Sequence, residues 1–171
     1  MPTKKGAGGR QQNYDPHTGR FAKTNFFVLP PFQPTRKEKA RKKEELRRKN
    51  LYDRAKNSKD ALVFETFCAI EQELPGSVQF VNEKRPDPFL GKLREFDIIT
   101  KKCIIEVKSG KKPKGLVQFL GQKRYAESRN KRHIVFAPNI SIAAKKSHEQ
   151  SGITIVKDYK LLIETVKEHE K

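Results

Sequence analysis

The chain has 171 residues, a formal net charge of +18 and a pI near 10.0, which leaves room for one domain with a hydrophobic core and an extension. A charge of this size indicates a polyanionic partner, most simply nucleic acid, with an anionic membrane surface as the weaker option. Because the sequence has no run of about 18 apolar residues and no apolar stretch behind Lys4 and Lys5, we expect no membrane span, no secretory signal and a cytoplasmic site of action.

The N-terminal third of the chain is basic. Residues 1–34 contain glycines and prolines without a helical or strand period, and we expect a flexible arm. Thr35 and Glu38 fit a capping box, which predicts a basic helix over residues 35–57. Residues 1–60 carry 17 Lys and Arg against 6 Asp and Glu, so this region is expected to neutralise phosphates, the alternative being a solvated helix that aids solubility. The residues predicted to bind nucleic acid on the helix are Arg36, Lys37, Arg41, Lys42, Arg47 and Arg48.

Residues 58–171 alternate between helical and strand patterns. Ser58 is the expected cap of a helix that ends before Pro75 and has one apolar face. The further expected elements are a strand over 77–81, a charged loop over 82–92, two strands within 94–109, a basic loop over 110–115, a helix over 116–128, a strand over 133–137, a helix over 140–149, a strand over 153–156 and a helix over 158–169. This order predicts an α/β domain with a central mixed sheet flanked by helices.

The stretch from 94 to 109 carries the sharpest chemical signal. If residues 101–102 form the turn of a hairpin, the numbers of paired residues sum to 203, and Asp97 lies opposite Glu106. Because side chains alternate along a strand, Glu106 and Lys108 share a face. Two facing carboxylates repel each other, whereas a divalent cation between them would make the arrangement favourable, since Mg²⁺ and Mn²⁺ prefer oxygen ligands.

The spacing Asp97-x8-Glu106-x-Lys108 resembles the PD-(D/E)XK nuclease superfamily, whose restriction-endonuclease-like core has the order α-β-β-β-α-β. The motif strand, followed by Gln-Phe-Leu-Gly-Gln-Lys-Arg-Tyr-Ala at residues 118–126, looks like the restriction-endonuclease-fold domains of polymorphic toxins. The segment 14–21, Tyr-Asp-Pro-His-Thr-Gly-Arg-Phe, is similar to a short element of Rhs-type polymorphic toxins and of some phage-associated proteins.

The resemblance implies a metal-dependent nuclease with Mg²⁺ or Mn²⁺ as cofactor. It implies that Lys108 orients or activates the attacking water and stabilises phosphate charge, with Gln118 near the active centre. The metal ligands that it implies are Asp97, Glu106, the carbonyl of Val107, and Glu65 on the first helix of the domain. Further contacts with nucleic acid are expected from Lys111, Lys112, Lys114 and Tyr125.

One position departs from the family pattern, and one dipeptide matches its letters at a different place in the chain. Phe96 precedes Asp97, where many members have proline. Pro86 and Asp87 match the motif letters, but Asp87 falls ten residues too early to face Glu106, so Asp97 is the better candidate.

Several alternatives stay open. We expect DNA more than RNA as the substrate, because the chain lacks an aromatic stacking platform of the kind that single-strand readers use. The sequence does not decide whether Lys108 acts as base or acid, whether the enzyme is a toxin with an acidic immunity partner or a phage enzyme, or which oligomer forms. The competing functions are a non-catalytic nucleic-acid-binding module on a nuclease-like fold and a structural or ribosome-associated basic protein. Cys68 and Cys103 lie in apolar runs without metal-ligand spacing and are expected to be free thiols.

Overall fold

A computed structural model describes residues 4–5, 11–15, 20–22, 34–87, 89, 91–113 and 115–170 of the chain. It divides into two compact units, Met1–Ala40 and Arg41–Lys171.

The first unit contains a small antiparallel sheet where we expected an arm without strands. Its strands are β1 (Lys4–Lys5), β2 (Gln11–Asp15) and β3 (Arg20–Ala22), in that order across the sheet. The segment that resembles a toxin element forms part of it, because Tyr14 pairs with Phe21 and Asp15 with Arg20. The strands were not predicted because they are short and polar, so they lack the apolar alternation by which a strand is recognised. The flexibility expected of residues 1–34 stays a prediction.

The helix α1 (Arg36–Lys56) begins as the sequence predicts. The N–H of Thr35 donates to Oε2 of Glu38 at 2.7 Å, and the N–H of Glu38 donates to Oγ1 of Thr35 at 3.2 Å. These reciprocal bonds confirm the capping box, which satisfies two of the free N–H groups at the start of a helix.

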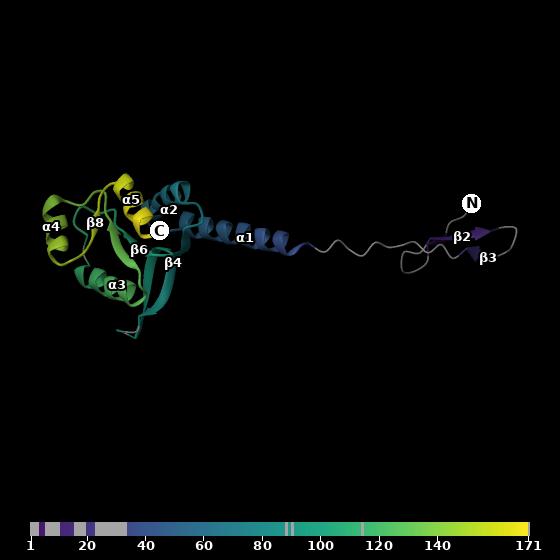
Figure 1. Ribbon diagram of the computed structural model, residues 1–171, viewed down its shortest axis with the longest axis horizontal. Coiled ribbons are helices and arrows are strands. Elements are labelled where there is room, and N and C mark those ends of the chain that lie inside the picture. Colours follow the sequence, from purple (N-terminus) through teal and green to yellow (C-terminus); the bar gives the residue numbers. More distant parts are fainter. Residues whose placement is uncertain are drawn as a thin grey trace. The chain divides into compact units, whose positions relative to one another are not determined.

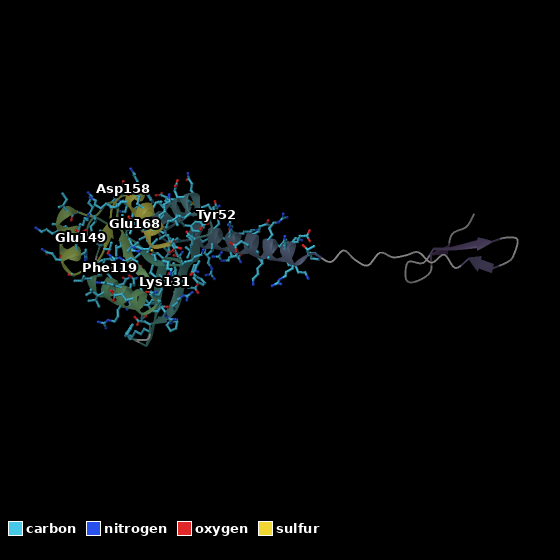
Figure 2. The ribbon with its side chains drawn as sticks, in the orientation of Figure 1. Tyr52, Phe119, Lys131, Glu149, Asp158 and Glu168 are labelled. Atoms are coloured by element: carbon cyan, nitrogen blue, oxygen red, sulfur yellow. The ribbon has the colours of Figure 1, made fainter. Side chains whose placement is uncertain are left out.

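Within the second unit, the C-terminal part of α1 packs on the domain through few residues. Leu51 and Ala55 are buried, and the Tyr52 ring meets the Phe64 ring edge-on at 5.3 Å between centroids (Tyr52 is labelled in Figure 2). The Arg47 guanidinium donates to the carbonyl of Val78 at 2.7 Å. The charged remainder of this helix stays exposed, as its composition predicts.

The centre of the second unit is a mixed five-stranded sheet. The strand order is β4-β5-β6-β7-β8, with antiparallel pairing through β6 and parallel pairing from β6 to β8. The elements are α2 (Ala61–Glu73), β4 (Val78–Asp87), β5 (Lys92–Thr100), β6 (Cys103–Val107), α3 (Leu116–Ser128), β7 (Arg132–Phe136), α4 (Ile142–Gln150), β8 (Ile155–Val156) and α5 (Tyr159–Glu170). Figure 1 shows α2 and α5 on one side of the sheet and α3 on the other. The α/β class and the order of elements in this unit agree with the prediction.

Strand β6 lies at the centre of the core and faces helices on both sides. Its residues Ile105 and Val107 pack in one cluster with side chains of α2 and α5, while Ile104 packs in another with Tyr125 and Ala126 of α3. Because side chains alternate along a strand, the next residue on the α3 side is Glu106. A carboxylate is therefore directed into an apolar layer.

Two boundaries differ from the sequence prediction. The loop expected over 82–92 is mostly strand, since β4 continues to Asp87 and β5 begins at Lys92; this part of the hairpin is largely exposed and charged, so no apolar alternation marks it. Helix α2 is capped by Asp60, whose Oδ1 accepts from the N–H of Leu62 at 3.0 Å, and not by Ser58. Among the described residues, no helix is both long and apolar enough to span a membrane.

Candidate active site

The β5–β6 hairpin has the predicted register. Ile98 pairs with Ile105 and Ile99 with Ile104, so paired numbers sum to 203 and the turn consists of residues 101–102. The turn is held by Thr100, whose Oγ1 accepts from the N–H of Cys103 at 2.9 Å. This register brings Asp97 to the level of Glu106.

The two strands part at Asp97. The N–H of Val107 donates to Oδ2 of Asp97 at 2.8 Å, so the aspartate side chain takes the place of a backbone acceptor. The N–H and C=O groups of one strand residue point to the same edge, which directs the Val107 carbonyl toward Asp97 as well. On the neighbouring strand β4, Asn82 has a φ of 47°, a conformation that asparagine tolerates better than most residues. Strands β4 and β5 are therefore irregular at the level of Asp97 and Glu106.

Glu106 is only 2% exposed and accepts three hydrogen-bond donors. Nε2 of Gln118 donates to its Oε1 at 2.8 Å, and Nε2 of Gln122 donates to its Oε2 at 2.6 Å. Nζ of Lys108 lies 2.6 Å from Oε1. A buried carboxylate needs such partners, because an unpaired charge in this layer would cost several kcal/mol.

The charges at the site oppose one another. Burial and the charge of Glu106 raise the pKa of Asp97 to about 7, against the lowering effects of the Val107 N–H and of Lys108. Burial works to lower the pKa of Lys108, but Glu106 and Asp97 outweigh it and raise that pKa. The Lys108 ammonium therefore interacts with two carboxylates, those of Glu106 and Asp97, so the cluster of these three side chains is negatively charged when all are ionised.

An open cleft of about 550 Å³ borders this cluster. Asp97 and Lys108 line it from the hairpin, and Asp60 lines it from the N-terminus of α2. The Ser109 hydroxyl donates to Oδ2 of Asp60 at 2.9 Å. The further lining residues are Asn57, Ser58, Lys59, Val63, Asn82, Glu95, Val107, Ser109, Gly110 and Pro113.

Glu65, the fourth predicted metal ligand, lies elsewhere. It is exposed on α2 and accepts from the hydroxyl of Tyr159 on α5 at 3.5 Å. The acidic groups that act on Asp97 and Lys108 are instead Glu106, Glu95 and Asp60. The position of Glu65 does not fit the predicted role, because the end of α2, and not its middle, faces the cleft.

The site offers carboxylate and carbonyl oxygens, the kind of ligand that divalent cations prefer, but both Glu106 oxygens already accept protein donors, and among the described residues no group of three or more His, Cys, Asp or Glu side chains could hold a metal ion. Mg²⁺ is commonly held by one or two carboxylates and keeps several waters, so Asp97, Glu106 and the Val107 carbonyl form an adequate set. Burial and the charge of Glu106 both raise the pKa of Asp97, and a cation beside the two carboxylates would offset that repulsion. The donor set therefore fits Mg²⁺ or Mn²⁺.

The predicted nucleic-acid contacts divide into three groups. Exposed side chains are those of Arg36, Lys37, Arg41, Lys42, Arg48, Lys111 and Lys112. Arg47 is half-buried and bonded to Val78, and Lys114 lies outside the described residues. Tyr125 is 3% exposed, with its ring 4.7 Å from that of Phe96, so its burial does not fit a contact with nucleic acid. Lys111 and Lys112 stand beside the cleft, in the loop between its lining residues Gly110 and Pro113.

The structure explains why phenylalanine can stand at position 96, where many members of the family that the sequence resembles have proline. It also explains what Asp87 does instead of facing Glu106. Phe96 is fully buried and fills the layer beneath α3, a volume that proline would leave empty. Asp87 is 2% exposed and pairs with Arg94 at 2.7 Å, and Arg94 in turn donates to the carbonyl of Gln118 at 3.2 Å. This arrangement anchors α3 to the hairpin, and a side chain at Gly121 would collide with the Arg94 guanidinium.

Sequence reasoning missed two residues of this site. Gln122 receives no role from the sequence, although its spacing of four residues from Gln118 places both amides on one face of the helix. Asp60 likewise receives no role in the site from the sequence. A carboxylate at a helix start is usually a cap, so no signal in the sequence could assign it to the cleft.

Comparison with protein-family models, with curated proteins and with solved structures found no match to this chain.

Proposed function

We propose that this protein is a metal-dependent nuclease that hydrolyses phosphodiester bonds, with a restriction-endonuclease-like core formed by α2, β4–β6, α3 and β7. The observation that carries the proposal is that Asp97 and Lys108 line one cleft of about 550 Å³, with the buried Glu106 carboxylate directly behind Lys108. The same three residues form the motif of the nuclease superfamily that the sequence resembles.

Asp97, Glu106 and the Val107 carbonyl would hold the cation. When bound, a divalent ion supplies charge neutralisation for the scissile phosphate and a water that is nucleophilic at neutral pH. Gln118 and Gln122 fix the Glu106 carboxylate through the two bonds described above, so its orientation does not depend on the substrate. Such pre-organisation lowers the cost of reaching the reactive arrangement.

Lys108 would stabilise the charge that accumulates on the phosphate. Its raised pKa keeps the ammonium protonated at neutral pH, which favours an electrostatic role or proton donation over a role as general base. Its side chain is 28% exposed, against 3% for that of Glu106. The ammonium can therefore reach a phosphate in the cleft while the carboxylate stays behind it.

The charge distribution favours nucleic acid as substrate. Lys59, Lys111 and Lys112 are exposed next to the cleft, and α1 adds a basic helix that leads to it through Asn57 and Ser58. Cationic side chains bind phosphates largely without regard to sequence. We take duplex DNA as the first substrate and RNA as the second. A toxin-like or phage-associated role, with an immunity protein in the former case, follows the resemblance.

The test is a cleavage assay on plasmid DNA and total tRNA, with Mg²⁺, with Mn²⁺ and with EDTA. Wild type should cleave one of these polymers only with a metal ion. Glu106→Gln and Lys108→Met should each slow cleavage by about 100-fold or more.

The matched control is Glu65→Gln, which removes a carboxylate from the exposed side of α2. It should cleave like wild type, and circular dichroism should show an intact fold in all variants. If wild type is active and Glu106→Gln and Lys108→Met are equally active, another site performs the chemistry and the proposal fails.

A second candidate, a non-catalytic nucleic-acid-binding module, is favoured by one observation. Glu106 already accepts three donors, as a purely structural carboxylate would. Under this reading no metal gives cleavage, and Glu106→Gln binds nucleic acid as tightly as wild type does.

A further inference from the structure

A second pocket lies at the opposite end of the parallel strands. It has a volume of about 520 Å³, which is within the usual range for small-molecule sites. Its lining residues come from the β5–β6 turn, the C-terminal half of α3, the starts of β7 and β8, and the end of α5: Lys102, Lys123, Glu127, Asn130, Lys131, Arg132, His133, Gly152, Thr154 and His169. Five separate elements therefore converge on it.

The charge of this pocket is one-sided. Among the described lining residues, Lys102, Lys123, Lys131 and Arg132 are cationic and Glu127 carries the one carboxylate. The Glu170 carboxylate lies nearby, where it accepts from the N–H of Lys102 at 2.8 Å and acts on Lys131. The Glu127 carboxylate lies 3.8 Å from Nζ of Lys123, and its side chain is 60% exposed. Glu127 therefore offsets little of the positive charge.

Several of these cations are held in place by bonds to neutral groups. Nζ of Lys123 donates to the carbonyl of Gly152 at 2.9 Å, and the Arg132 guanidinium donates to Oγ1 of Thr154 at 3.1 Å. Because lysine has three donors and arginine five, each keeps donors for a ligand. Bonds to carbonyl and hydroxyl oxygens position these cations without neutralising them.

Asn130 and Lys131, which directly follow the C-terminus of α3, also line the pocket; Lys131 is labelled in Figure 2. Exposed carbonyls at a helix end would repel an anion. Here the backbone N–H groups of Arg129 and Lys131 both donate to the carbonyl of Ala126, and that of Asn130 donates to the carbonyl of Glu127. These bonds reduce the repulsion.

His133 is the observation that points to a ligand. It is 4% exposed, lines the pocket, and neither ring nitrogen has a hydrogen-bond partner in the described part of the chain. Burial, together with the charges of Lys123 and Arg94, lowers the pKa of His133 to about 4, so the ring is neutral near pH 7, with one donor and one acceptor. Leaving both buried and unpaired is unfavourable, and a hydrogen bond to a ligand would relieve part of that cost.

We propose that this pocket binds a phosphate-bearing ligand, with Lys102, Lys123 and Arg132 contacting the phosphate oxygens and His133 donating one hydrogen bond. Phosphate fits the chemistry because arginine and lysine form their strongest hydrogen bonds with such oxygens. The volume exceeds that of a lone phosphate and leaves room for an attached group, such as a second phosphate or a terminal nucleotide. The site lies at the N-terminal end of β6 and β7, away from Lys108 at the C-terminal end of β6, so it does not depend on the proposed nuclease chemistry.

The test follows the imidazole signals of the full chain by NMR, in EDTA, during titration with inorganic pyrophosphate at constant ionic strength. The His133 signals, assigned with His133→Gln, should shift and saturate. The double variant Lys102→Glu/Arg132→Glu should weaken binding by about tenfold or more. Both side chains are exposed, so the variant should fold.

The matched control is Lys157→Glu/Lys160→Glu, which makes the same change of charge on exposed residues outside the pocket, and it should bind pyrophosphate like wild type. A shift that does not saturate, or one that both double variants weaken equally, would show only diffuse positive potential and would overturn the proposal.

Oligonucleotides with a 5′-phosphate or a 5′-hydroxyl distinguish the two sources of phosphate. Tighter binding of the phosphorylated oligonucleotide identifies a nucleic-acid end as the ligand, whereas saturable binding of pyrophosphate alone identifies a free phosphorylated compound. If neither probe shifts His133, the pocket does not bind phosphate.

Discussion

The two ends of β6 and β7 carry opposite charge. At the C-terminal end, Glu106 is buried and Asp97 half-buried, and Lys108 pairs with Glu106. At the N-terminal end, four cationic side chains line a pocket together with His133 and the exposed carboxylate of Glu127. The same strands thus carry at one end an acidic cluster, which favours a bound cation, and at the other end a basic pocket, which favours a bound anion.

The difference lies in how each buried polar group is satisfied. Glu106 has three protein donors and is fixed before any ligand arrives. His133 has no partner in the described part of the chain. A buried group that the protein satisfies contributes to stability, and one that it leaves unsatisfied reduces stability until a ligand binds. Substitutions at the two ends should therefore have unequal effects.

The largest effect is expected for Glu106→Leu. Removing the carboxylate leaves the two glutamine amides and the Lys108 ammonium without their acceptor, which should lower the free energy of unfolding by about 3 kcal/mol. Urea denaturation at neutral pH measures it. A loss below about 1 kcal/mol would mean that solvent satisfies these donors and that the cluster is not organised by Glu106.

A smaller, pH-dependent effect is expected for Asp97→Asn. The folded pKa of about 7 lies above the ordinary 3.8, so the folded protein holds an extra proton between these values and wild-type stability falls as the pH rises through this window. Across this window the free energy of unfolding of the variant should rise relative to that of wild type, by about 2 kcal/mol near pH 8. This is less than the full linkage value, because the Asp97 carboxylate is partly open to solvent. Urea denaturation at pH values on either side of the window tests this. A gap that does not change with pH would contradict the buried-pair explanation.

A third comparison separates Asp60 from Glu65 on the same helix. Asp60→Asn keeps a good cap but removes a charge that acts on Lys108, and it should lower the cleavage rate by about tenfold, the effect of about 1.4 kcal/mol on a barrier. Glu65→Gln should leave the rate unchanged, because Glu65 faces Tyr159. Rates measured side by side with the preferred polymer decide this. The reverse result would restore the role that the sequence first assigned to Glu65.

The smallest effect is expected for His133→Leu, the counterpart of Glu106→Leu at the basic end. It removes two unsatisfied nitrogens and keeps an apolar volume, so the free energy of unfolding should stay within about 1 kcal/mol of wild type or rise. The same urea experiment measures it in phosphate-free buffer. A loss as large as that of Glu106→Leu would show that His133 has protein partners.

Much of the second unit follows from local pattern. The hairpin register could be predicted because apolar residues on both sides of a two-residue turn leave one pairing that buries them. The bounds of α3 and the capping box of α1 agree with prediction for similar reasons, since both depend on residues close in sequence. The position of Asp97 at the level of Glu106 is a direct consequence of that register.

The features of the two sites that could not be predicted from the sequence depend on contacts between distant elements. Glu65 matched a family position, but the packing of α2 directs it to α5 and brings Asp60 to the cleft. Tyr125 is aromatic, as residues that stack on nucleobases are, but the packing of α3 on Phe96 buries its ring. The basic pocket joins five elements, so none of its residues is distinctive within its own segment.

The bond from the Val107 amide to the Asp97 carboxylate makes the site observable. An amide that donates to a titrating carboxylate changes its proton chemical shift and its rate of hydrogen exchange when that carboxylate gains or loses a proton. The backbone resonance of Val107 should therefore follow the protonation of Asp97 in wild-type protein, near pH 7. A cation that displaces this proton would move the midpoint downward, so one peptide group reports on both acid and metal.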